Sequence, residues 1–385
     1  MSGNKEKVSS VKCLSYDKSE LLDKVRDAVK LAGGFPSKVK KGSSVLLKPN
    51  MLTARAPEYA VTTHPEFIRA VILLLKEIGA EVSVGDSPAG GHKWEKIWTD
   101  TGIKKICQEE NVRLIPFENA KIIKFKKDQN IPILKELDDF DAMISLPKLK
   151  THILTKVTGA IKNSYGLVIG HAKSHFHSVY PSPRKMSEFI GELYGHIKPD
   201  FVIMDAIVCM EGDGPNTGYP FNAGVIFAGR DGVAVDSCAI RVFGYDYKDI
   251  MHITVAAGKG YGIADWDSIE KLGDGFEELE KIRGKRSKAD FLFKIPEKLF
   301  FVITMITKSR PSIDVAKCAK CGICIKACSQ KAIFKKNEMY NVTASRCVLC
   351  MCCIEACSYQ AISLRSSKVW EFLLKGRQLL NKLKK

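Results

Sequence analysis

The 385-residue sequence lacks the features that identify several common classes of protein. No apolar run approaches the roughly 18 residues that a membrane-spanning helix needs, and the longest one covers residues 299–306. The first ten residues are polar and contain lysine, unlike a secretory signal peptide. No P-loop, nucleophile elbow, H-E-x-x-H motif or glycine-rich dinucleotide fingerprint is present. These absences predict a soluble cytoplasmic protein in a reducing compartment, without a Rossmann-type nicotinamide or flavin site.

Acidic residues are scarce relative to basic ones. The chain contains 60 Lys and Arg against 43 Asp and Glu, a formal net charge of +17. Such a balance favours acidic partners: nucleic acid, anionic lipid, an acidic electron carrier or a phosphorylated ligand. The lysines form no basic block interleaved with aromatic residues, which disfavours nucleic acid. The length and a hydrophobic content of 45% predict two or three domains with real cores.

Cysteine, in contrast, is abundant near the C-terminus. Two runs, at residues 318–328 and 347–357, share the spacing C-x2-C-x2-C-x3-C. This spacing is typical of bacterial [4Fe–4S] sites, in which the fourth cysteine of one run ligates the cluster of the other. Zinc would have no use for the third closely spaced cysteine, and disulfides this close would be strained. The runs therefore predict two [4Fe–4S] clusters, one held by Cys318, Cys321, Cys324 and Cys357 and the other by Cys347, Cys350, Cys353 and Cys328.

The stretch 311–364 resembles a bacterial-type ferredoxin with two [4Fe–4S] clusters. Ala332-Ile333 and Ala361-Ile362 match the strand starts of that family and indicate a duplicated unit. The family usually has proline directly after the fourth cysteine, where this sequence has Ser329 and Ser358. Because that proline shapes a turn and is not a ligand, we expect both clusters to remain.

Five further cysteines stand outside the two ligand sets. Cys352 lies one residue before a predicted ligand, and we interpret it as a packing or spare thiol rather than a cluster ligand. The others have no ligand spacing and are interpreted as small buried apolar residues: Cys13, Cys107, Cys209 and Cys238.

The region 8–262 alternates short apolar runs with helical segments. The predicted strands cover residues 8–14, 45–47, 80–85, 142–146, 201–204 and 225–228, and the helices 19–31, 65–78, 182–197 and 233–243. This alternation predicts an α/β fold, a mainly parallel sheet with helices on both faces, followed by an α+β ferredoxin-like two-cluster domain.

The predicted domain boundaries follow from these patterns. Residues 1–264 form the α/β domain, 265–310 a helical connector, 311–364 the ferredoxin domain and 365–385 a basic amphipathic tail helix. The tail's apolar side predicts docking on the protein's own surface, with peripheral membrane contact as the alternative.

Polar residues follow four of the predicted strands directly. In open α/β sheets, ligands bind outside the carboxyl ends of the strands. Lysines and amides gathered there suit a phosphate or carboxylate, which predicts a site for an anionic small molecule. Solvated loop residues are the alternative interpretation. The candidates are Lys48, Asn50, Asp86, Ser87, Lys148, Lys150, His152, Lys162, Asn163, Glu211 and Asp213.

Two other segments allow more than one interpretation. Glu211 and Asp213 lie in a glycine-rich turn that could hold Mg²⁺ together with Asp205 and Asp86, or supply a general base. A tight polar turn is the alternative interpretation. Three histidines have a spacing that suits a metal if the segment is helical, but nearby Gly and Pro favour a loop with surface histidines or a lid: His171, His175 and His177.

The large region also resembles a known family, the prokaryotic domain of unknown function 362, which often carries a C-terminal ferredoxin segment. The resemblance rests on motifs that recur in order: Lys48-Pro49-Asn50, Thr63-His64-Pro65-Glu66, Gly85-Asp86-Ser87-Pro88, Leu146-Pro147-Lys148-Leu149-Lys150-Thr151-His152, Thr158-Gly159-Ala160-Ile161-Lys162-Asn163, Met210-Glu211-Gly212-Asp213-Gly214-Pro215 and Ala234-Val235-Asp236. Asp231-Gly232 stands where the family commonly has Asp-Pro, a change that touches only a helix start. The resemblance implies an architecture but no activity.

The sequence supports three functional hypotheses. The first is an iron–sulfur redox protein that passes electrons through two clusters to an anionic substrate or cofactor at the strand ends; if it is an enzyme, it is a ferredoxin-type oxidoreductase. The second is a non-enzymatic electron carrier or assembly factor. The third is an RNA-binding protein with structural clusters. The first two require a redox partner protein or a small-molecule donor.

Overall fold

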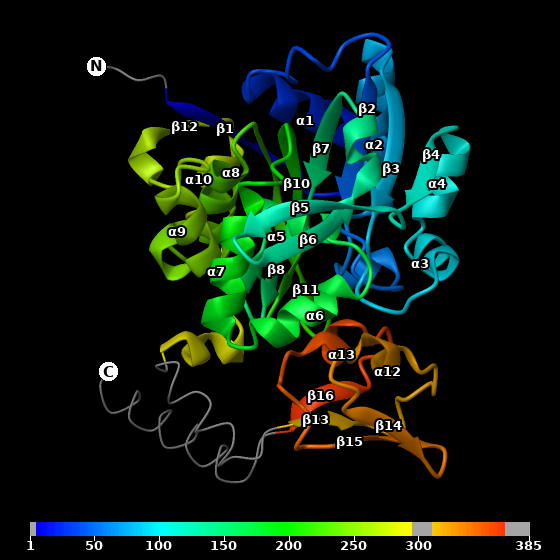
Figure 1. Cartoon of the computed structure of the whole chain (residues 1–385). Coiled ribbons are helices and arrows are strands. Elements are labelled where there is room, and N and C mark those ends of the chain that lie inside the picture. The colour runs from blue at the N-terminus through cyan, green and yellow to red at the C-terminus, as the bar shows by residue number, and fades with distance from the viewer. Residues whose placement is uncertain (1–4, 295–309, 366–385) are drawn as a thin grey trace.

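The computed structural model describes residues 5–294 and 310–365. Figure 1 shows a large domain built around one sheet and, below it, a smaller part formed by residues 310–365, which we call the cysteine segment. The predicted tail helix 365–385 and most of the apolar stretch before residue 310 lie outside the described residues. No helix in the described part of the chain is long and apolar enough to cross a membrane.

The large sheet has the strand order β12-β1-β11-β10-β7-β2-β3-β4, and β8 and β9 extend it beside β10. Its strands are β1 (Glu6–Lys12), β2 (Ser44–Pro49), β3 (Glu81–Asp86), β4 (Arg113–Pro116), β7 (Ala142–Leu146), β8 (Lys148–His152), β9 (Lys156–Thr158), β10 (Phe201–Glu211), β11 (Tyr219–Gly229) and β12 (Ile269–Leu272). The apolar runs predicted as strands all lie in this sheet.

The sheet is mixed rather than simply parallel. Strands β10, β7, β2, β3 and β4 pair in parallel, whereas β11 is antiparallel to both β10 and β1. The connection between β10 and β11 covers only residues 212–218, which is too short for the crossover helix that a parallel pair needs. A tight turn therefore forces the long β10–β11 hairpin, which the alternation of strands and helices did not predict.

Helices cover both faces of this sheet. One apolar core lies under α1 (Lys18–Leu31), α2 (Pro65–Ile78), α3 (Trp94–Asp100) and α4 (Ile103–Glu109). The other lies under α5 (Ala160–Ser164), α7 (Pro183–Tyr194), α8 (Gly232–Ala239) and α9 (Met251–Gly258). Asp231 caps α8 by accepting from the amides of Val233 and Ala234, so the change from Asp-Pro leaves the helix start intact.

Strand β8 corrects one expectation about the strand ends. The lysine-rich stretch after Pro147 was expected to be a loop, but it forms a strand whose five residues are all buried. The chain turns at Pro147 and pairs with β10 a second time. Strand β7 pairs with the start of β10, and β8 pairs with β10 farther along. Alternation along β8 places Lys148, Lys150 and His152 on one face. The two lysine amines and the imidazole are buried and have partners in the protein, so they are not solvated loop groups.

The segment predicted as a helical connector contains a strand. β12 pairs in parallel with β1 at the edge of the large sheet, and only short helical turns surround it, among them α10 (Gly275–Glu278) and η7 (Lys288–Lys294). Because β1 would otherwise be an open sheet edge, pairing with β12 covers its free hydrogen-bonding groups. The connector is thus partly a component of the large domain.

The cysteine segment has a duplicated order of elements. It contains β13 (Arg310–Ile313), α12 (Ile323–Ala327) and β14 (Ile333–Lys336), then β15 (Met339–Val342), α13 (Cys352–Glu355) and β16 (Ile362–Arg365). Strand β13 pairs with β16, and β14 pairs with β15. The strands that follow the cysteine runs begin at Ile333 and Ile362, as predicted. Helices α12 and α13 face the large domain (Figure 1).

Candidate functional site

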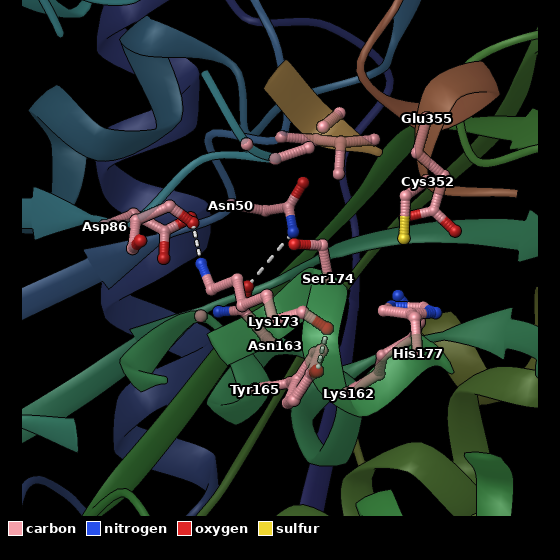
Figure 2. A pocket seen from close by; sticks show the side chains of 16 residues that line it. Asn50, Asp86, Lys162, Asn163, Tyr165, Lys173, Ser174, His177, Cys352 and Glu355 are labelled. Carbon is pink, nitrogen blue, oxygen red and sulfur yellow. Dashed lines mark hydrogen bonds between the residues drawn. The ribbon is translucent and has the colours of Figure 1, made fainter. Parts of the chain in front are cut away.

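A cavity of about 70 Å³ lies between the large domain and the cysteine segment (Figure 2), and we call it the interdomain cavity. Its walls come from the ends of β2 and β3, from α5, from α6 (Ala172–Val179) and from α13. Five of the predicted site residues line it: Asn50, Asp86, Ser87, Lys162 and Asn163. The cavity thus lies at the carboxyl edge of the strands, where a ligand of an α/β sheet is expected.

A buried ion pair lies beside the cavity. Lys48 Nζ is 2.6 Å from Asp86 Oδ1, and Asp86 Oδ2 accepts a hydrogen bond from the amide of Met51 at 2.8 Å. Burial lowers the pKa of Lys48, and the charge of Asp86 opposes that shift. A Cβ atom on Gly166 would collide with both charged groups, so only glycine fits there. The pair fixes the ends of β2 and β3 relative to each other.

Two asparagines continue this polar network. Asn50 Nδ2 donates to Asn163 Oδ1 at 3.2 Å, while Lys150 Nζ donates to Asn50 Oδ1 at 2.9 Å. Lys150 also donates to the carbonyl of Val61 at 2.6 Å, and burial lowers its pKa well below the usual value. Lys150 therefore lies behind the cavity and orients Asn50. The asparagines present their amides at the cavity wall.

Helix α5 is held in place by a carboxylate from a distant motif. Asp236 accepts from the amides of Ala160 at 2.6 Å and Ile161 at 3.0 Å. Burial raises the pKa of Asp236 to about 7. This contact joins two of the recurring motifs and positions Lys162, whose amine has no hydrogen-bond or ion-pair partner among the described residues. Burial lowers the pKa of Lys162, and Glu355 opposes the shift.

Helix α6 forms another wall, and its helical structure corrects the expected loop. His171 and His175 are exposed, whereas His177 is only 5% exposed, lines the cavity and has no hydrogen-bond partner at Nδ1. Burial lowers the pKa of His177 to about 4, so the imidazole is neutral near pH 7. One helical turn earlier, Lys173 donates to the carbonyl of Ser87, and burial lowers its pKa to about 7.

The cysteine segment closes the cavity with α13. Cys352 and Glu355, three residues apart on this helix, both line the cavity, and Figure 2 shows their side chains beside His177. Glu355 lies 3.3 Å from Nε2 of His152, a predicted site residue that is fully buried. The pKa of His152 is lowered to about 3, with desolvation as the largest cause. His152 therefore contacts the helix that closes the site.

Polar contacts dock the two parts onto each other. Ser358 Oγ lies 2.8 Å from Thr53 Oγ1, and Ser329 Oγ donates to the carbonyl of Ser174 at 3.1 Å. These serines occupy the positions where ferredoxins usually have proline, which has no hydroxyl. The buried Asn216 adds a third contact, donating to the carbonyl of Cys357 at 2.7 Å.

The eight predicted ligand cysteines surround two further cavities. Cys318, Cys321, Cys324 and Cys357 (the first set) line one, and Cys328, Cys347, Cys350 and Cys353 (the second set) line the other. Within the described residues, no three His, Cys, Asp or Glu side chains converge on a single ion position. A cuboidal cluster, which is larger than an ion, keeps its four thiolates farther apart.

The surroundings of the two sets fit such a group. Backbone amides of Ala332 and Ala361 donate to Cys328 Sγ at 3.2 Å and Cys357 Sγ at 3.3 Å, and amide donors to sulfur tune iron–sulfur clusters. In both runs the residues on either side of the second cysteine have positive φ, which curls the backbone around the cavity: Lys320 and Gly322 in the first run, Leu349 and Met351 in the second.

The remaining predicted site residues lie elsewhere. Lys148 is 2.7 Å from Asp205 in a buried ion pair that Tyr16 joins. Glu211 and Asp213 accept from backbone amides of Lys285 and Lys288 and thereby hold the connector against the β10–β11 turn. The structure does not bring these carboxylates to the interdomain cavity, and the Mg²⁺ ion stays a prediction.

Comparison with known proteins agrees with this architecture. The profile of the domain of unknown function DUF362 matches residues 45–241, about half of the chain. The chain belongs to the DUF362 family. A curated relative, the thylakoid-associated protein sll1697 of Synechocystis sp. (strain ATCC 27184 / PCC 6803 / Kazusa), is 32% identical over 258 residues, which cover 66% of this chain and 79% of the relative. The matched DUF362 region contains most of the cavity wall, but α13 lies outside it.

Sequence reasoning missed several residues of this DUF362 site. Lys173 and Ser174 belong to a segment that follows no strand end, and Glu355 lies inside a cysteine run that draws attention to its ligands. His177 was considered as a metal ligand, a surface loop residue or part of a lid, but not as a residue of this cavity. The i, i+4 spacing of Lys173 and His177 was the available signal, because it places both on one face of a helix.

Proposed function

We propose that this chain is an iron–sulfur redox protein whose interdomain cavity binds a phosphate- or carboxylate-bearing substrate or cofactor. The first and second sets of cysteines would each hold one [4Fe–4S] cluster, which supplies one-electron chemistry when bound. The observation that carries the proposal is the composite wall of the cavity: one side belongs to the large domain and the other to the cysteine segment. A ligand there would lie next to the cluster-binding part of the same chain.

The charges around the cavity favour an anion. Lys48 and Asp86 compensate each other, and Glu355, beside a His152 that is neutral near pH 7, is one negative charge set against the two amines of Lys162 and Lys173. Lys162 is the cation without a described partner, and Lys173 adds a second amine. A lysine ammonium with nearby amide donors suits a carboxylate or phosphate group. The volume of about 70 Å³ admits such a group, since a water needs roughly 10–15 Å³ of comparable space.

Covalent attachment of the cysteine segment supports a dedicated role. Tethering raises the effective concentration of one module at the other. The contacts of Ser329, Ser358 and Asn216 add a defined orientation to that tether. A carrier that serves many partners would gain nothing from this arrangement.

The test is anaerobic. The purified protein, loaded with iron and sulfide, is reduced with dithionite and freed of excess reductant. It is then mixed with carboxylates and phosphate esters that also carry a reducible carbonyl or carbon–carbon double bond, which accepts two electrons from the clusters together with two protons. We expect at least one of them to accelerate reoxidation of the clusters, followed by their visible absorbance, by roughly tenfold or more. A tenfold change corresponds to about 1.4 kcal/mol of activation free energy. Lys162→Ala should remove the acceleration. Reoxidation that no ligand changes, together with rapid exchange with a redox protein, would favour the electron carrier or assembly factor instead.

A further inference from the structure

The two cysteine sets have different neighbours. Cys352 lines both the cavity of the second set and the interdomain cavity. Ala327, adjacent to Cys328 of the second set, also lines the interdomain cavity. Among the described residues, none that lines the cavity of the first set lines the interdomain cavity. The second set therefore lies beside the proposed ligand.

The first set reaches the protein surface. Cys321 is exposed, and Tyr359, which lines the same cavity, is 44% exposed. Val315, just before the first run, is 57% exposed. Lys317 and Lys320 are exposed on either side of Cys318. From the large domain, the exposed Lys96 lies near Cys321 and Tyr359, and its amine pairs with Asp100 at 2.6 Å.

The exposed apolar and basic residues around the first set are typical of a docking surface for a redox protein. Transient electron-transfer contacts are small, and complementary charge steers them more than it strengthens them. The exposed side chains of Val315 and Tyr359, together with the exposed Lys96, Lys317 and Lys320, fit a partner with an acidic rim. The strongly basic chain, with a formal net charge of +17, would attract such a partner from a distance.

We infer that the two sets have fixed and different roles: the first set faces an acidic redox protein, and the second set meets the ligand through Cys352. This inference rests on the proposed function. Cys352 is then neither a cluster ligand nor a spare thiol but the side chain that separates the second set from the ligand. Its neighbour on the same helix face, Glu355, completes that wall.

The ligand side is tested with two substitutions of Cys352. Cys352→Ser keeps the size of the side chain, whereas Cys352→Leu fills the end of the interdomain cavity. We expect both variants to retain the iron content of the parent protein, and Cys352→Leu to weaken binding of acetate and inorganic phosphate at least tenfold while Cys352→Ser binds them normally. Cys238→Ser, at a buried cysteine that lines neither cavity, is the control. Unchanged binding by Cys352→Leu would overturn the inference.

A spectroscopic measurement tests the same arrangement without any ligand. In the reduced protein, electron paramagnetic resonance should resolve two signals, and Cys352→Ser should shift one of them. We expect an external paramagnetic complex such as a nickel chelate to relax the other signal at least threefold more strongly. If the nickel chelate relaxed the signal that Cys352→Ser shifts more strongly than the other signal, the assignment of the second set to the interior would be wrong.

The partner side is tested by charge reversal. The triple variant Lys96→Glu, Lys317→Glu and Lys320→Glu should slow reduction by an acidic flavodoxin at least tenfold at low salt, and added salt should narrow the difference. The matched control is Lys18→Glu, Lys30→Glu and Lys40→Glu, at three exposed lysines on or near α1, which changes the charge by the same amount and should have less than a twofold effect. Equal effects of both variants would show that overall charge, not this surface, guides the partner.

Failure of the proposed function can be distinguished from failure of this inference. A purified chain that holds no iron would refute the proposed function, whereas the binding of acetate and phosphate by the Cys352 variants could still be measured and compared.

Discussion

Lys48 Nζ lies 2.6 Å from Asp86 Oδ1, and the side chains are only 1% and 4% exposed. The two residues end neighbouring parallel strands, β2 and β3, so the pair bridges the strand ends directly beside the interdomain cavity. Removing one partner from a buried pair leaves an uncompensated charge, which costs more than losing the pair as a whole.

The first prediction follows from that asymmetry. Asp86→Asn should lower the free energy of unfolding by about 3–5 kcal/mol, because Lys48 keeps its charge without a counterion. The double variant Lys48→Met, Asp86→Leu should recover a large part of the loss. Urea unfolding of the three proteins measures the difference. A single variant as stable as the parent would mean that Lys48 is neutral in the native protein.

The second prediction concerns metal content. Anaerobically purified protein should contain about eight irons and eight acid-labile sulfides per chain, from two complete four-cysteine sets. Colorimetric iron and sulfide assays measure both. Cys352→Ser should leave these values unchanged, since Cys352 belongs to neither set. A content near one zinc with no sulfide would disprove the cluster assignment.

The third prediction concerns Lys162. Lys162→Ala should weaken binding of a small carboxylate or phosphate by at least tenfold. The amine of Lys162 lines the cavity and has no hydrogen-bond or ion-pair partner among the described residues, so it is available to a bound anion. The melting temperature should change by less than about 2 °C, as is usual for a side chain outside the core. Lys162→Arg should bind more tightly than Lys162→Ala. Calorimetric titration and a thermal melt separate binding from folding.

The fourth prediction is a pH dependence from Lys173. Burial lowers its pKa to about 7 from 10.5, against the opposing charge of Asp86. Anion binding should therefore weaken as the pH rises through about 7, because the amine loses its charge. Between about pH 7 and the ordinary lysine pKa of 10.5, Lys173 is protonated in the unfolded chain but neutral in the native chain. The contribution of Lys173 to the free energy of unfolding therefore rises with pH over this range. Titrations of Lys173→Met should lack the step near neutrality.

The fifth prediction tests the docking serines. Thr53→Ala and Ser358→Ala each remove one side of a hydrogen bond across the two parts. In a double-mutant cycle the pair should couple by about 0.5–1.5 kcal/mol. Ser358→Pro restores the residue usual in ferredoxins and should increase hydrogen exchange in α13 without loss of iron. An uncoupled cycle would mean that the two parts separate readily in solution.

Much of the secondary structure was predictable because it depends on local order in the chain. The apolar runs that became β2, β7 and β10, and the helix from Pro65 to Ile78, are set by periodicity, capping and a terminating Gly79. The two cysteine runs likewise carry their ligand spacing within eleven residues each. The family motifs place Asn50, Asp86 and Lys162 near one sheet edge, and these three line the cavity.

The tertiary structure alone decided how these parts meet. Burial turned Lys148 and Lys150 from expected loop residues into partners of Asp205 and Asn50, because an amine inside the protein must be neutralised or hydrogen-bonded. The fourth wall of the site comes from α13, nearly two hundred residues after α5. No local pattern encodes that contact, since it depends on how the cysteine segment packs against the large domain, where Leu154 joins the core of that segment. The sequence by itself determined which side chains are candidates for binding an anion or a cluster, because residue type and spacing are local. The packing of the two parts determined which of them share one cavity.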